Sequence, residues 1–119
     1  MSRAIIVKEE IVERDTSFFA IYLETKNSSF LLMSEGEDQL GTLAVAMPQP
    51  QKLVGPPLSS ILLGDRNMMI ARILAELLAK NTRKMASVSV FTKTLVETEA
   101  APILRKLMEK TLRKKEEEK

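Results

Sequence analysis

The stretch SFFAIYLET, Ser17–Thr25, is the clearest strand in the sequence, and it points to the class of fold. Its side chains alternate with the period of two that is typical of a β-strand. Both of the alternating series are apolar: Phe19, Ile21 and Leu23 on one side, and Phe18, Ala20 and Tyr22 on the other. We therefore expect both faces of this strand to be buried.

The run AIIVKEEIVER, Ala4–Arg14, precedes that strand and is rich in β-branched residues. Its apolar positions change phase, so we expect a long strand with a β-bulge near Lys8–Glu10. Asp15 and Thr16 separate the two runs and suit a tight hairpin.

Short strands and turns follow as far as residue 63. We expect a turn at Lys26–Ser29, a strand at Phe30–Met33, an acidic turn at Ser34–Gly41, a strand at Thr42–Met47, an exposed proline-rich loop at Pro48–Pro57 and a brief strand at Leu58–Leu63. Strands at such short spacing predict an antiparallel meander.

Two helical patterns flank one more strand. The first has apolar residues at Ile70, Ile73, Leu74, Leu77 and Leu78, with Asn81 expected as a left-handed C-cap. Met85–Phe91 alternates and predicts a strand. The second helix has its stripe at Ile103, Leu104, Leu107, Met108 and Leu112, with Thr98 expected as N-cap and Pro102 in the first turn.

This order predicts a single α+β domain over residues 1–119. We expect an antiparallel β-sheet of about five to six strands with two helices packed on one face. The helices then leave one apolar face without a cover. We therefore expect two copies to pair sheet against sheet, and we assign Phe18, Ala20, Tyr22, Ala44 and Ala46 to the dimer interface.

The composition removes several classes of chemistry. The chain of 119 residues contains no cysteine and no histidine. Disulfides, thiolate metal sites, zinc chemistry and catalysis by Ser-His-Asp or Cys-His are therefore excluded. Catalysis by a carboxylate or a lysine stays open, but the sequence shows no arrangement of residues for it. We expect no catalytic residue, no cofactor and no metal ion, and a protein that is not an enzyme.

The charge of the chain is concentrated at its C-terminal end. Residues Arg105–Lys119 hold seven Lys/Arg against four Glu, whereas the formal charge of the whole chain is +2. We expect this basic segment to be a solvated helix face with a fraying end, and a nearly neutral body makes nucleic acid an unexpected partner. Without a signal peptide or an apolar membrane-spanning run, the expected location is the cytoplasm, away from any membrane.

Four polar features each have a simple structural interpretation. Asp65 is expected to cap the helix that follows it, and Ser59 and Ser60 lack a base that could activate them. The acidic residues Glu35, Glu37 and Asp38 are expected to form a solvated turn rather than a calcium site. Met68 and Met69 suit either the core or an adaptable surface, and we favour the core.

The proline-rich loop is the best candidate for contact with a partner. Its prolines stiffen it without supplying donors to a sheet. Its polar side chains suit a wet contact surface, and its apolar ones are expected to be exposed and able to anchor a partner. We assign to partner binding Gln49, Gln51, Lys52, Leu53 and Val54. The alternative for Leu53 is that it folds back onto the core.

Four segments resemble the proteasome assembly chaperone family, in its third and fourth eukaryotic types and their archaeal relatives. They are LAVAM (Leu43–Met47), SSILLGD (Ser59–Asp65), IARILAELLAKNTRK (Ile70–Lys84) and ASVSV (Ala86–Val90). The matching positions are Ser60, Leu62, Leu63, Gly64, Asp65, Leu77, Ala79, Lys80 and Thr82. The chain departs from the family in its more proline-rich loop and its longer basic end.

The resemblance implies a small subunit that dimerises through its sheets and holds α-type subunits of the 20S proteasome while their ring assembles. The dimer would contain two copies of this chain, as suits an archaeal homodimer, or one copy and a paralogue. Two alternatives remain open: a dimeric adaptor of the roadblock or longin kind, and a small dimeric nucleic-acid binder.

Overall fold

The computed structural model describes residues 3–49 and 58–118. In chain order the elements of this part are β1 (Ile5–Glu13), β2 (Thr16–Glu24), β3 (Ser28–Glu35), β4 (Thr42–Met47), β5 (Leu58–Leu63), α1 (Met68–Thr82), β6 (Met85–Phe91) and α2 (Glu97–Glu117). The predicted strands at β4, β5 and β6 are confirmed at their full lengths. The third strand is longer than predicted and includes Ser28 and Ser29, which we had assigned to a turn.

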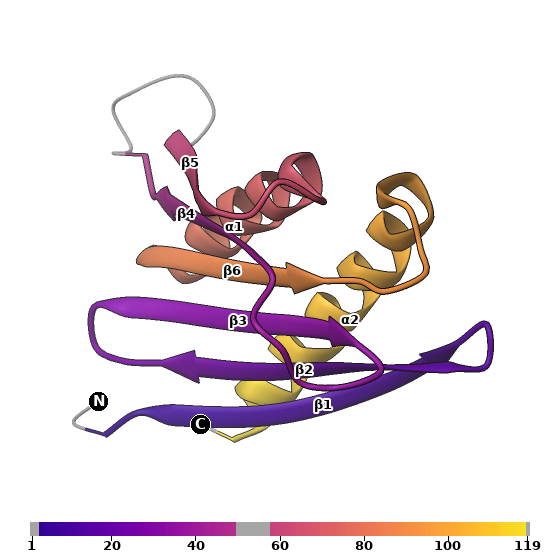
Figure 1. Ribbon diagram of the computed structural model, residues 1–119. Coiled ribbons are helices and arrows are strands. Elements are labelled where there is room, and N and C mark those ends of the chain that lie inside the picture. Colours follow the sequence, from indigo (N-terminus) through magenta and orange to yellow (C-terminus); the bar gives the residue numbers. More distant parts are fainter. Residues whose placement is uncertain (1–2, 50–57, 119) are drawn as a thin grey trace.

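The strands form one mixed sheet in the order β1-β2-β3-β6-β4-β5 (Figure 1). β6 lies between β3 and β4, parallel to β3 and antiparallel to β4, and the other neighbours are antiparallel. The α+β class with two helices is confirmed. The predicted antiparallel meander is wrong beyond β3, because the last strand inserts between two strands that are consecutive in sequence.

The hairpin between β1 and β2 is regular. Ile5 pairs with Glu24 and Glu13 with Thr16, with no interruption between them, so the predicted bulge near Lys8–Glu10 is wrong. The turn residues Arg14 and Asp15 have φ of 54° and 59°. Two consecutive positive φ values are typical of a type I′ turn, whose twist matches that of the strands.

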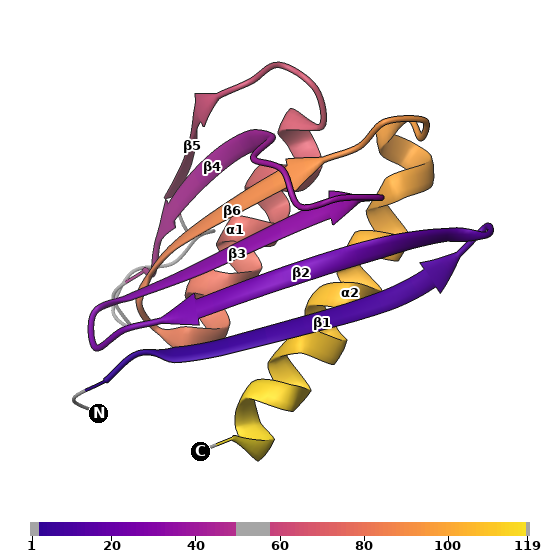
Figure 2. The same ribbon diagram turned by 60° about the horizontal axis from the view of Figure 1, so that its bottom comes forward.

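Both helices lie on the same face of the sheet, as two views show (Figures 1 and 2). α2 packs across β1 and β2, and α1 packs on β4 and β6 and reaches the flank of β5. The core lies between the sheet and these helices, where the largest buried side chains include Tyr22, Phe18, Leu31, Leu74 and Leu104. Within the described residues neither helix is both long and apolar enough to cross a bilayer.

The ends of α1 differ from the prediction. Asn67, not Asp65, precedes the first helical residue, and its own side chain caps nothing. The free N–H of Ile70 instead donates to Glu97 Oε2 at 2.7 Å, so the start of α2 caps the start of α1. At the other end Arg83, with φ of 58°, takes the left-handed position predicted for Asn81.

The beginning of α2 also lies earlier than expected. Val96 occupies the N-cap position predicted for Thr98, and its N–H donates to Glu99 Oε1 at 3.3 Å. Pro102 is therefore inside the helix rather than in its first turn.

Candidate functional site

The residues predicted for a dimer interface are in the core of the chain itself. Phe18, Ala20, Tyr22, Ala44 and Ala46 are each at most 1% exposed. They belong to the face of the sheet that α1 and α2 cover, so a second copy cannot reach them while the helices are in place. The prediction that Phe18, Ala20 and Tyr22 lie on the face away from the helices is therefore wrong, because these residues face α1 and α2.

The opposite face of the sheet is apolar, and no helix covers it in the described part of the chain (Figure 2). The strand register places the following apolar side chains on this open face: Ile6, Val12, Phe19, Ile21, Leu23, Phe30, Leu32, Phe91, Leu43, Val45, Met47, Leu58 and Leu63. At the rim Ile6 is 61% and Leu58 74% exposed, whereas Leu32 and Val45 are half-buried among their neighbours. The same register places Lys8, Glu10, Ser60 and Ser87 on this face as well. Apolar side chains gathered in this number on one open face mark an interaction surface.

The connection between β3 and β4 crosses one end of the open face. It must pass over β6, because that strand lies between the two it joins. Gly41 makes the crossing possible, since a Cβ atom at this position would lie 2.1 Å from the carbonyl oxygen of Val90. Two serines hold the segment: Gly41 N–H donates to Ser89 Oγ at 2.8 Å, and Ser34 Oγ donates to the Gln39 carbonyl at 3.0 Å.

A buried ionic cluster anchors the end of α2 to the covered side of the sheet. Glu24, which is 4% exposed, accepts hydrogen bonds from Tyr22 Oη at 2.6 Å and Lys84 Nζ at 2.6 Å, and pairs with Lys115 Nζ at 2.9 Å. Burial alone would raise the pKa of Glu24, but Lys84, Tyr22 and Lys115 together lower it from 4.5 to about 2. Burial and the Glu24 carboxylate raise the pKa of Tyr22.

This cluster corrects the prediction for residues 105–119. Lys115 is 4% exposed and ion-paired, so the segment is not simply a solvated, fraying end. Sequence reasoning missed Glu24 and Lys115 because 91 residues separate them along the chain. The only local signal is that Glu24 continues the series of Phe18, Ala20 and Tyr22.

The acidic turn contains one structural carboxylate. Glu35 is 3% exposed and accepts hydrogen bonds from Lys93 N–H at 2.9 Å and Thr94 Oγ1 at 2.5 Å, so it is not solvated as predicted. Burial opposes its ionisation, but these hydrogen bonds outweigh burial and lower the pKa of Glu35. Glu37 forms an exposed ion pair with Lys93 Nζ at 2.7 Å. Glu35 thereby fixes the loop that leads from β6 to α2.

The described residues contain no cluster of side chains that could hold a metal ion. Ser59 Oγ donates to Glu76 and accepts from Arg72 Nε at 3.1 Å, which ties β5 to α1. Ser60 is exposed on the other side of the strand.

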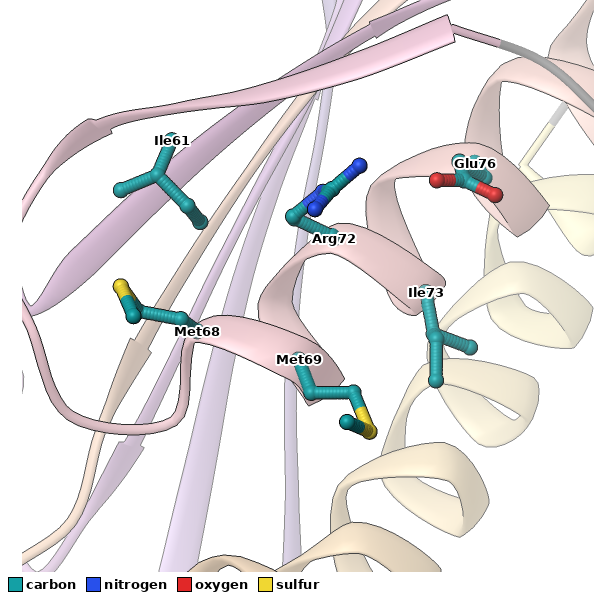
Figure 3. Close-up of a pocket in the computed structure, with 6 residues that line it drawn as sticks. All are labelled: Ile61, Met68, Met69, Arg72, Ile73 and Glu76. Carbon is teal, nitrogen blue, oxygen red and sulfur yellow. The ribbon is translucent and has the colours of Figure 1, made fainter.

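Met68 and Met69 are not core residues, contrary to our preference. They are 45% and 67% exposed and line a groove between α1 and β5 (Figure 3). Of the residues assigned to partner binding, Gln51, Lys52, Leu53 and Val54 lie outside the described residues. Gln49 is half-buried just beyond β4.

Comparison with known proteins shows a shared fold. The sequence matches no family model and no curated protein sequence. The structure is similar to a chain in a crystal structure described as a novel chaperone complex for yeast 20S proteasome assembly. The TM-score is 0.67 over 92% of this chain and 93% of that chain, at 13% sequence identity. The chain thus has the fold of a proteasome assembly chaperone.

Proposed function

We propose that this chain is a non-enzymatic assembly chaperone that pairs with a second copy and, as a dimer, binds α-type subunits of the 20S proteasome. The observation that carries this proposal is the open apolar face of the sheet, in a chain whose fold is that of a proteasome assembly chaperone. An isolated subunit with such a face would expose it to water, whereas two subunits stacked face to face would bury it.

The size of the face suits a stable pair. Six strands about 4.8 Å apart and about 20–30 Å long give each copy a face of about 600 Å² in projection. Two faces together come to about 1,200 Å², the lower end of the range for specific interfaces. Pairing through the open face leaves both helices on the outside, free to contact a proteasome subunit.

We assign the contact with the α subunit to the loop Pro48–Pro57, with Gln49, Gln51, Lys52, Leu53 and Val54 as its binding residues. Replacing Gln51–Val54 with glycine and serine should weaken α-subunit binding and leave the dimer and the melting temperature nearly unchanged. A large fall in melting temperature would instead assign Leu53 and Val54 to the core.

Light scattering coupled to size-exclusion chromatography tests the pairing. We expect twice the chain mass for the wild-type protein and a folded monomer for Leu32→Glu, which places a charge near the centre of the open face. Val96→Glu is the control, because Val96 is 58% exposed at the start of α2, outside that face. A wild-type monomer at high concentration would contradict the pairing.

Native mass spectrometry with recombinant 20S α subunits tests the chaperone role separately. We expect a complex of one chaperone dimer with an α subunit, and no such complex for a Leu32→Glu monomer. A stable dimer that binds no α subunit would leave the pairing intact and refute the proteasomal function.

A further inference from the structure

The two edge strands of the sheet, β1 and β5, differ in whether other residues cover their unpaired backbone groups. The β1 edge is capped by α2: Lys110 Nζ donates to the Glu10 carbonyl at 2.8 Å, and Lys114 Nζ donates to the Lys8 carbonyl at 3.0 Å. Lysines at a sheet edge are a common protection against pairing with another chain. The lysines of α2 therefore close this edge to an added strand.

The β5 edge has no such protection in the described part of the chain. β5 pairs with β4 alone, and its sequence LSSILL contains neither a charged residue nor a proline. The one irregularity of its pairing, next to Leu43, affects only its final residues and leaves Leu58–Ile61 in regular register. A regular strand with unpaired backbone donors and acceptors is a template for a further strand.

An apolar groove runs beside this open edge. It has a volume of about 360 Å³ and is lined by Ile61, Met68, Met69, Arg72, Ile73 and Glu76 (Figure 3). The hydrogen bonds of Ser59 with Arg72 and Glu76 hold strand and helix together, so the groove is preformed. Met68, 45% exposed, lies beside Ile61 on the side of α1 toward β5, whereas Met69 and Ile73 point away from that strand (Figure 3). Methionine suits such a place because its flexible side chain adapts to different partners.

We propose that an extended segment of another protein chain binds here as an added strand beside β5, with uncharged apolar side chains at alternate positions facing the groove. The segment would satisfy the unpaired backbone groups of β5, and the groove would select its side chains. Met68–Glu76 spans about 12 Å of helix, the length of about four extended residues, so two alternate side chains of the segment face α1.

A second copy of this chain does not fit the groove. α1 rests on β4 and β6, about one and a half strand spacings inside β5. If two copies paired β5 to β5, their α1 axes would lie about 19 Å apart, against the 8–10 Å of packed helices, and each β5 would bring only one apolar side chain, that of Ile61, to the helix side, where the groove admits two. The groove also lies on the helix side of the sheet, so its use does not depend on the proposed dimer.

Fluorescence anisotropy with a synthetic peptide tests this inference on the full chain. The probe is a labelled peptide of seven residues in which threonine alternates with valine and leucine. We expect saturable binding that Met68→Glu weakens about tenfold or more, since it removes an apolar contact beside β5 and introduces a charge, and that Ile73→Glu, on the side of α1 away from β5, leaves unchanged. Val96→Glu and Leu32→Glu, outside the groove, should bind the peptide as the wild-type protein does.

Backbone methylation of the peptide distinguishes an added strand from a side-chain contact. Alternate N–H groups of an added strand point toward β5, and the remaining ones point to solvent. N-methylation of one alternate set should abolish binding, and methylation of the other set should leave it unchanged. Equal effects of the two sets, or no binding of the unmodified peptide, would overturn the proposal. Release of the peptide as protein concentration rises would assign the edge to a second copy and overturn it as well.

Discussion

Replacing Glu24 with glutamine tests whether the buried ionic cluster holds α2 on the sheet. Glu24 is the only carboxylate that contacts Lys84, Lys115 and Tyr22 together among the described residues. The substitution keeps the shape of the side chain but leaves the ammonium of Lys115, which is 4% exposed, without its buried counter-charge. Removing one partner from a buried ion pair costs about 3–5 kcal/mol.

The pKa of Glu24 gives a second value for the stability that the cluster contributes. Its decrease from 4.5 to about 2 in the folded chain corresponds to about 3 kcal/mol of stability, in agreement with the first figure. Because the folded pKa lies below the unfolded one, this contribution is complete above about pH 4.5 and is lost as the pH falls toward 2. At pH 3 about 2 kcal/mol of it has gone.

Urea unfolding at pH 7 and pH 3 measures both effects. We expect Glu24→Gln to be less stable than the wild type by about 3–5 kcal/mol at pH 7 and to lose less stability on acidification. Lys115→Met is the matched variant, with an expected cost of about 1.5–3 kcal/mol because Lys84 and Tyr22 still serve the carboxylate. If Glu24→Gln lost as much stability between pH 7 and pH 3 as the wild type, the cluster would not have the strength argued here.

Three further substitutions test local features. Glu97→Ala should lower the free energy of unfolding by about 1 kcal/mol through the lost cap of α1, and an unchanged urea midpoint would contradict this role. Asp15→Gly should raise the melting temperature, since glycine adopts a positive φ without strain, and a decrease would show that the aspartate side chain has a role of its own. Gly41→Ala should destabilise the chain by more than about 3 kcal/mol, because the crossing over β6 has no room for a methyl group, and a variant with wild-type stability would refute that reading.

Elements that depend on local pattern could be predicted from the sequence. The strands at Thr42–Met47, Leu58–Leu63 and Met85–Phe91 follow from alternation, and the structure has them where they were expected. The predicted stripe of α1 is buried at Ile70, Leu74 and Leu78, whereas Ile73 is 42% exposed. Consecutive strands are neighbours about two-thirds of the time, so the meander was the best expectation. β3 and β4 belong to the minority of consecutive strands that are not neighbours, because β6 lies between them. No local feature of the sequence marks this insertion.

The orientation of the sheet faces could not be read from alternation alone. In β2 both series are apolar, and the pattern does not say which of them the helices cover. The charged end of the strand carries the missing information: Glu24 is in phase with Phe18, Ala20 and Tyr22, and its partners come from α2 and from the residue before β6. The groove was missed for a related reason, because Met68 and Met69 fit a core as well as a surface.

The contacts between α2 and β1 have a consequence for the synthesis of the chain. Lys114 reaches the backbone of Lys8, and Lys115 reaches Glu24, so the earliest strands receive their cover from the latest helix. While the ribosome is still translating α2, the β1–β2–β3 hairpins have their apolar side uncovered and the β1 edge unprotected. Pairing β3 with β6 also requires closure over about 50 residues, which slows folding. The nascent chain is therefore most exposed to aggregation in the interval before residue 115 emerges.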